Sequence, residues 1–266
     1  MSWIQEFLND LPMSSTFIFW GTFILLSSAA YCGKYALRNH RTTFNDDQAK
    51  IVLGAILSLL GLLIGFVLSI SIGGYNERQK TEENEMVVIG TALQRTQLLD
   101  IAQQQQAKIL LHQYLDARIA FFQSETQLDN KNWRLISAEK QNQLWAIAVT
   151  EANKAPNPVT ASVLSAYNDL YISQEKTTVS WRYQIPNIVW ALLIFFAIFS
   201  NFFIGYNARK EQGMNLLMLV LPFLTTLALF IIAEIDIPGK GVIHVTPDDL
   251  LSLKEIWNSQ IENKSL

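Results

Sequence analysis

Charged residues are scarce in this sequence, and so are cysteine and histidine. Asp, Glu, Lys and Arg together make up 16% of the residues and hydrophobic residues make up 50%, whereas soluble domains usually carry about 25% charged residues. The one cysteine excludes an internal disulfide, and the net charge of −3 gives no basic excess of the kind that binds nucleic acid. The composition therefore favours lipid as a partner and gives no indication of nucleic-acid binding.

Charge is missing altogether from four long stretches, and each of them exceeds the roughly 20 residues that a helix needs to span a bilayer. Backbone groups in lipid must pair within the protein, and unbroken apolar runs achieve this as helices. We therefore expect an all-α membrane protein with four transmembrane helices and a long helical insertion between the second and third. The predicted segments are an interfacial N-terminal segment 1–13, transmembrane helices 14–33, 51–75, 185–207 and 213–233, the insertion 77–182, and the C-terminal tail 234–266.

Catalytic and metal-binding patterns are also missing. His40, His112 and His244 are far apart in the sequence, and no HExxH, Walker, GxGxxG or GxSxG pattern occurs. We accordingly predict that the protein is not an enzyme and holds no cofactor or metal. The four stretches also lack an ionisable residue near their centres, which disfavours proton-coupled transport but leaves a passive pore open.

The insertion lacks glycine after Gly90 and has no proline before Pro156, which favours long helices. Its apolar residues Leu110, Tyr114, Ala117 and Phe121 recur at helical spacing and predict a packed core. The second transmembrane helix enters the insertion without a proline, so the sequence allows a single rod from Ile51 to Phe121, with Gly73 and Gly74 as the place for a bend. At Ala155-Pro156-Asn157-Pro158 the prolines predict an interruption.

Small residues follow one face of the second transmembrane helix at offsets of three and four. Such a stripe lets two helices approach closely, or it lines a narrow conduit in an oligomer, and the central helices of an oligomer would satisfy both interpretations. The stripe consists of Gly54, Ser58, Gly61, Gly65, Ser69 and Gly73.

Four charged residues flank the ends of the helices that enter and leave the insertion: Arg78, Glu85, Arg95 and Arg182. They are expected to form either an ion-pair cluster that fixes these helices or a charged vestibule that attracts ions. Basic residues also gather in the short connections, with Lys34, Arg38, Arg41 and Lys50 in the first, and Arg209 and Lys210 in the third. The positive-inside rule then predicts an extracytoplasmic insertion in the cell (inner) membrane.

Several motifs resemble the bestrophin-like domain family of bacterial membrane proteins. They are Gly61-Leu-Leu-Ile-Gly-Phe-Val-Leu-Ser, Tyr75-Asn-Glu-Arg78, Ile89-Gly-Thr-Ala-Leu-Gln-Arg95, and the closing motif Asp236-Ile-Pro-Gly-Lys-Gly-Val-Ile-His-Val245, with Asp236, Pro238 and Gly241 as its candidate site residues. Family members usually read Glu-Ala-Asn where this chain has Glu85-Met-Val87. The family takes its name from the bestrophins, pentameric anion channels with four crossings and a helical insertion that lies in the cytosol.

Two functional hypotheses follow. The first is a homo-oligomeric channel-like protein whose second transmembrane helix lines an ion pathway, with inorganic ions as its solute; a preference for anions is implied by the family name alone. The second is a non-conducting scaffold or sensor whose helical insertion binds a partner. Assembly around an axis is the natural route to a pore for four spans that carry no buried charge.

Overall fold

The computed structural model describes residues 15–36, 46–124, 126–208, 216–239 and 243–262. The predicted interfacial segment 1–13 and Gly241 of the closing motif lie outside these ranges. The chain divides into two compact units. We call residues 1–73, 184–237 and 241–243 the membrane unit, and residues 74–183, 238–240 and 244–266 the helical unit.

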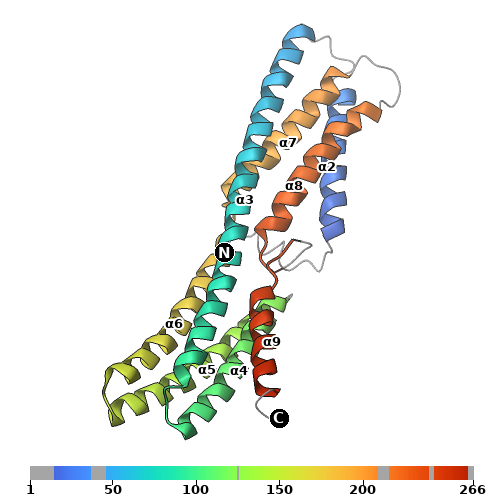
Figure 1. Cartoon of the computed structure of the whole chain (residues 1–266). Helices are drawn as coiled ribbons and strands as arrows, with labels where there is room; N and C mark the ends of the chain where they lie inside the picture. Colours follow the sequence, from blue (N-terminus) through green and yellow to red (C-terminus); the bar gives the residue numbers. More distant parts are fainter. Residues whose placement is uncertain (1–14, 37–45, 125, 209–215, 240–242, 263–266) are drawn as a thin grey trace. The chain divides into compact units, whose positions relative to one another are not determined.

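The membrane unit contains four apolar helices, and it confirms the all-α membrane fold predicted from the sequence. Its helices α2, α7 and α8 run side by side (Figure 1). A 3-10 turn, η1 (Leu216–Leu219), precedes the last of them. The elements are α2 (Ser15–Ala36), the first half of α3 (Asp46–Thr96), α7 (Asn187–Asn207) and α8 (Val220–Asp236). All four helices are long and apolar enough to cross a membrane.

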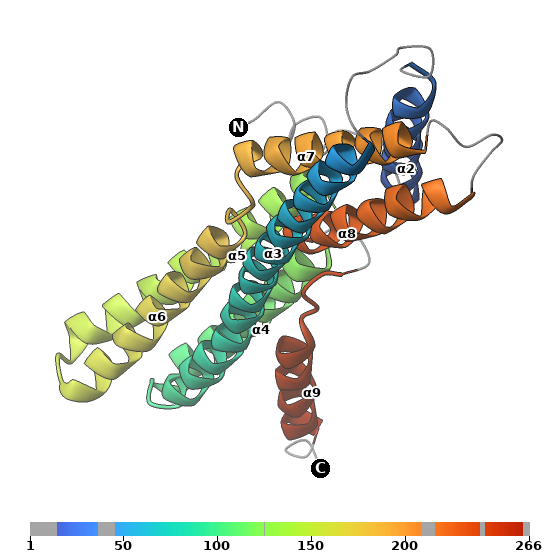
Figure 2. The same cartoon turned by 90° about the horizontal axis from the view of Figure 1, so that it is seen from above.

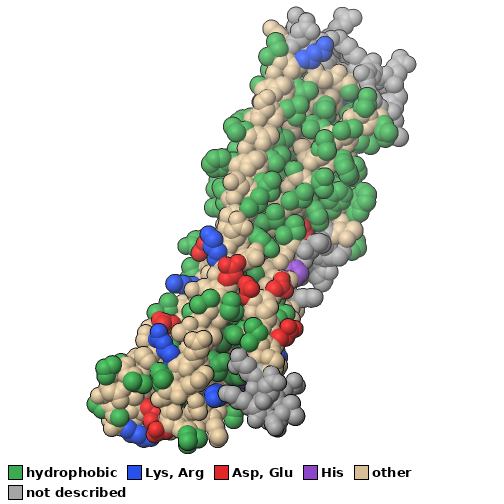
Figure 3. Space-filling model, in the orientation of Figure 1, with side chains coloured by type: hydrophobic (Ala, Val, Ile, Leu, Met, Phe, Trp, Pro, Cys, Tyr) green, Lys and Arg blue, Asp and Glu red, His purple; other side chains and the backbone are tan. Residues whose placement is uncertain are grey.

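The core of the membrane unit is a cluster of aliphatic side chains contributed by all four helices, including Leu26, Val67, Leu193 and Ile232. Much of the remaining apolar surface is exposed, with Ile188 at 76% as an example. Side chains of this type cover the face of the membrane unit seen in Figure 3. Exposed apolar side chains at this density are expected where the surrounding solvent is lipid.

The helical unit comprises the second half of α3, then α4 (Ile101–Gln123), α5 (Gln127–Lys154), α6 (Pro158–Ser180) and α9 (Asp248–Glu262). Helix α4 packs on α5, and α5 on α6, and Figures 1 and 2 show these neighbours side by side. Its large core includes the predicted residues Leu110, Tyr114 and Phe121, and most of the charged side chains visible in Figure 3 belong to this unit.

The interruption at residues 155–158 is confirmed. Helix α5 ends at Lys154 and α6 begins at Pro158, where a proline is tolerated because the first turn needs no N–H partner. The Asn157 side chain accepts hydrogen bonds from the backbone N–H groups of Val159 and Thr160, at 2.8 and 3.0 Å. The amide cap and the proline together fix this helix start.

The continuous rod that the sequence allows from Ile51 to Phe121 does not form. Helix α3 continues into the helical unit but ends at Thr96, and α4 begins at Ile101. The turn contains neither glycine nor proline, so the sequence carries no local signal for it. Reversal of the chain buries Leu99, Ala107 and Leu111 in the core of the helical unit, and this tertiary packing outweighs the local preference for a longer helix.

Candidate functional site

The small-residue stripe of α3 is exposed at all six positions from Gly54 to Gly73. A Cβ atom added at Gly54, Gly61, Gly65 or Gly73 would meet no heavy atom within 4 Å. In contrast, Leu60, Val67 and Ser71 of the same helix are buried. At 100° per residue the stripe lies about 150° from that buried face. Helix α3 therefore uses one face within its own unit and leaves the small-residue face open.

Close helix packing through glycine occurs elsewhere, at the crossing of α2 and α7. A Cβ atom at Gly33 would overlap the carbonyl oxygen of Phe202, and one at Gly205 would overlap the carbonyl oxygen of Ala30. These two glycines allow the backbones to touch, which is the usual role of small residues between membrane helices. Sequence reasoning missed them because neither belongs to a repeat of glycine and serine residues at offsets of three and four like the one that marks the stripe.

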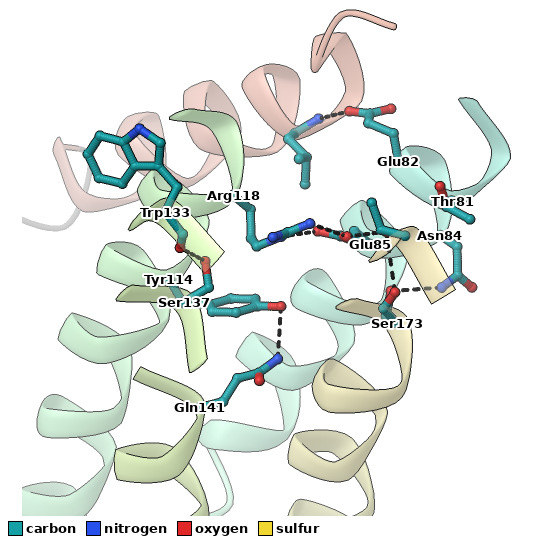
Figure 4. Close-up of polar contacts among 12 residues, drawn as sticks. Thr81, Glu82, Asn84, Glu85, Tyr114, Arg118, Trp133, Ser137, Gln141 and Ser173 are labelled. Atoms are coloured by element: carbon teal, nitrogen blue, oxygen red, sulfur yellow. Dashed lines mark hydrogen bonds and ion pairs between the residues drawn. The ribbon is translucent and has the colours of Figure 1, made fainter. Parts of the chain in front are cut away.

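Glu85, one of the four predicted charged residues, forms a buried ion pair with Arg118 of α4 (Figure 4). The Arg118 Nε and Nη2 atoms donate to the Glu85 carboxylate at 2.6 and 2.7 Å, and the Thr177 hydroxyl also donates to it. The Glu85 side chain is 1% exposed and that of Arg118 is fully buried. The guanidinium carbon lies 4.4 Å from the centre of the Phe121 ring. The pair is therefore bidentate and shielded from water.

The sequence analysis did not single out Arg118, although its position in the sequence indicates a buried charge. It lies beside Ala117 within the apolar stripe that runs from Tyr114 to Phe121, and a charge within a core stripe requires a buried partner. The three predicted arginines have other surroundings. The Arg78 Nη1 atom donates to the Tyr183 carbonyl at 3.5 Å, Arg95 Nη1 donates to the Ser162 carbonyl at 2.9 Å, and Arg182 is exposed just beyond α6.

Electrostatics fix the protonation states around this pair. Burial by itself lowers the pKa of Arg118, but the charge and hydrogen bonds of Glu85 outweigh burial and raise it. Burial raises the pKa of Tyr114, whose hydroxyl accepts a hydrogen bond from Gln141 at 3.1 Å. Arg118 thus stays charged and Tyr114 neutral across the physiological pH range. A fixed charge pair of this kind suits a structural role better than proton transfer.

The closing motif contributes a buried carboxyl group to the membrane unit and a turn to the helical unit. In the membrane unit, the buried Asp236 accepts a hydrogen bond from the Ile185 N–H at 2.9 Å, just before α7 begins. In the helical unit, Pro238 precedes Gly239, which has a φ of +72°. A Cβ atom at Gly239 would lie 2.9 Å from the Trp181 ring. Both the backbone angle and this contact require glycine, which explains part of the motif.

No group of three or more His, Cys, Asp or Glu side chains is placed to hold a metal ion within the residues that the structure describes. His112 lies 3.2 Å from Asp116 and 3.3 Å from Asn258, on the surface between α4 and α9. It is therefore part of a surface contact between two helices.

A family model for the Bestrophin-like domain matches residues 21–250. The chain belongs to the bestrophin-like domain family. The match runs from α2 to the first turn of α9, so it includes both units and the closing motif, and it extends further toward the N-terminus than the motifs quoted above. No curated protein and no solved structure matches the chain. Membership supports a multi-pass membrane protein of channel type.

Proposed function

We propose that this protein forms a homo-oligomeric ion channel in which the α3 helices of several subunits surround a central pathway. The observation that carries the proposal is the open small-residue face of α3. Its glycines have free space around them, whereas Gly33 and Gly205 are filled by packing within the chain. Because the part of the chain that the structure describes leaves these positions open, the stripe is available for other subunits or for permeating ions.

The length of the stripe also supports this role. From Gly54 to Gly73 it covers nearly the whole apolar part of α3, about 30 Å at 1.5 Å per residue. Small side chains over this distance keep a central pathway wide enough for an ion, and exposed backbone and hydroxyl oxygens supply weak polar contacts. The family name makes anions the first solutes to test.

The decisive experiment compares Gly65→Leu with Gly21→Leu. Both glycines lie in apolar helices and have no heavy atom near the position of a Cβ, but only Gly65 belongs to the stripe. If the stripe lines a pore, Gly65→Leu abolishes ion flux in liposomes and leaves the oligomer intact. If it packs subunits together, the oligomer dissociates. Gly21→Leu should preserve both properties, and a Gly65→Leu protein with normal assembly and flux would refute both roles of the stripe.

We further propose that the helical unit faces the extracytoplasmic side of the cell membrane, supported by the basic residues of the short connections. Single cysteines at Asn142 on α5 and at Lys50 near the start of α3, both exposed, test this in a Cys32→Ser background. A membrane-impermeant maleimide applied to intact cells should label Asn142→Cys and spare Lys50→Cys. The reverse result would place the helical unit in the cytosol, as in the bestrophins.

A scaffold or sensor without conductance is the second candidate. It is supported by apolar side chains on the outer surface of α5, where Leu128 is 69% exposed and Leu135 is 62% exposed. These residues are one heptad apart and therefore share a helix face that a partner protein could cover. Absence of flux under any voltage or pH, together with a monomeric or dimeric state, would favour this candidate over the channel.

A further inference from the structure

Helix α9 is attached to the helical unit by a small apolar anchor and a set of polar contacts. Leu250 and Trp257 are buried in the core of the unit, at 0% and 5% exposure. On the flank that faces α4, Lys254 forms an ion pair of 2.7 Å with Asp116. The helix is only 15 residues long, so its position depends on these few contacts rather than on its own stability.

The start of α9 is held by a carboxyl group from a different helix. Glu82 of α3 is 2% exposed, and its Oε1 atom accepts a hydrogen bond of 3.0 Å from the Leu250 N–H (Figure 4). Leu250 is in the first turn of α9, where backbone N–H groups have no partner within the helix. Glu82 therefore acts as a cap for one of the N–H groups at the start of α9.

A second carboxyl group shares this place. The Asp249 carboxyl group, next to Leu250, raises the pKa of Glu82 both by its charge and as a hydrogen-bond partner, and two carboxyl groups can share a hydrogen bond only when one of them holds a proton. Burial and the neighbouring charges of Asp249 and Glu85 raise the pKa of Glu82 to about 7, although the Leu250 N–H acts in the opposite direction. The charge of Glu85 is itself neutralised by Arg118.

The charged groups around this contact have hydrogen bonds or ion pairs of their own. On α9, Asp248 accepts a hydrogen bond from the Thr246 hydroxyl, and Lys254 is bound to Asp116. Along α3 the nearest arginine, Arg78, donates to the Tyr183 carbonyl. The described hydrogen bonds and ion pairs of Glu82 include no cation, so a proton is what relieves the repulsion between the two carboxylates. Loss of that proton leaves a negative charge on the buried Glu82 beside the charge of the half-buried Asp249, which is costly.

We propose that a proton shared by Glu82 and Asp249 controls the docking of α9, so that the helix is bound at acidic pH and loosens as the pH rises through neutrality. The sign follows from linkage. The docked state binds the proton more tightly than an undocked state in which Glu82 returns to its ordinary value of 4.5. The contribution of the proton to docking is complete below that value, declines as the pH rises, and is lost above about 7. Helix α9 thereby reports the pH on the side of the membrane that the helical unit faces.

Hydrogen exchange of the full-length protein in detergent tests this proposal. Protection factors of the α9 amides, which correct for the intrinsic pH dependence of exchange, should be at least about tenfold lower at about pH 8 than at about pH 5. Amides around Leu144 in the core of the helical unit should keep their protection and thereby show that the unit stays folded. Equal protection of α9 at both pH values would overturn the proposal.

Two substitutions separate the shared proton from other pH effects. In Glu82→Gln the amide oxygen still accepts from Leu250 and the amide N–H₂ donates to Asp249, so the variant mimics the protonated state and α9 should stay protected at both pH values. Glu83→Gln is the matched control, because Glu83 is the exposed neighbour and should keep the wild-type pH response. Should Glu82→Gln fail to fold, Asp249→Asn removes the same repulsion and should also retain protection at about pH 8. If either variant lost α9 protection at about pH 8 as strongly as the wild type, the proposal of a shared proton would be contradicted.

Discussion

The two units surround their buried polar groups with different side chains. The core of the membrane unit is aliphatic, and its buried polar groups include a small neutral amide, Asn201, which donates to the Ala197 carbonyl at 2.7 Å and to the Thr225 hydroxyl at 3.3 Å. The helical unit buries a full ion pair, Glu85 and Arg118, and surrounds it with aromatic rings. Water around the helical unit allows a large apolar core to offset the desolvation of two charges, whereas lipid gives no comparable driving force between helices. The buried charged residues of the membrane unit, Lys34, Glu234 and Asp236, lie near the ends of α2 and α8.

Contacts between helices differ in the same way. In the membrane unit, α2 and α7 approach until their backbones touch at Gly33 and Gly205. In the helical unit, large side chains such as Tyr114, Phe122 and Leu144 separate the helices and fill the space between them. The membrane unit thus depends on close van der Waals contact, and the helical unit on burial of apolar area.

The largest effect is expected when the buried ion pair is broken on one side. Arg118→Met leaves the Glu85 carboxylate buried without its cation, and removal of one partner from such a pair costs about 3–5 kcal/mol. Thermal or chemical unfolding of the protein in detergent should show this loss of stability. The double variant Glu85→Leu/Arg118→Met should recover most of it, because no uncompensated charge remains.

Arg182→Met is the matched control for this prediction. Arg182 is exposed, so its replacement should change the free energy of unfolding by no more than about 0.5 kcal/mol. If Arg118→Met were as mild as Arg182→Met, the ion pair would contribute little and the contrast between the two cores would fail. If the double variant were as unstable as Arg118→Met, the packing volume rather than the charge would be the important property.

The sequence predicted the fold class and the interruption before α6 because both depend on local composition. Four uncharged stretches can only be helices in lipid, and Pro156 and Pro158 cannot continue a helix. The reversal between α3 and α4 was not predictable locally, since residues 97–100 contain no glycine or proline. It depends on the burial of Leu99 and Leu111, which are brought together only by the tertiary fold.

The candidate site was predictable to a similar degree. The periodicity of the α3 stripe identified a face that the structure leaves open, since the offsets of three and four determine the helix face on which residues lie. The sequence singles out Glu85 as one of the charged residues that flank the membrane ends of the helices, but it does not single out Arg118 or Glu82. Their partners, Glu85 and the N-terminus of α9, are separated from them by 33 and 168 residues. Contacts at such distances leave no periodic signal in a single sequence.

A smaller effect is expected at the glycine contact of the membrane unit, where Gly205→Ala adds one methyl group against the Ala30 carbonyl. The methyl group is attached directly to the α7 backbone and the carbonyl is part of the α2 backbone, so the overlap is relieved only if the two helices move apart. Overpacking of this kind typically costs about 1–3 kcal/mol. Gly21→Ala is the control, because the same methyl group meets open space there and alanine is the better helix former. In unfolding experiments in detergent, Gly205→Ala should therefore be less stable than the wild type, and Gly21→Ala should be as stable as the wild type or more stable. Were the two variants equally stable, the backbone contact would not stabilise the membrane unit, and its cohesion would have to come from aliphatic packing of the kind that stabilises the helical unit.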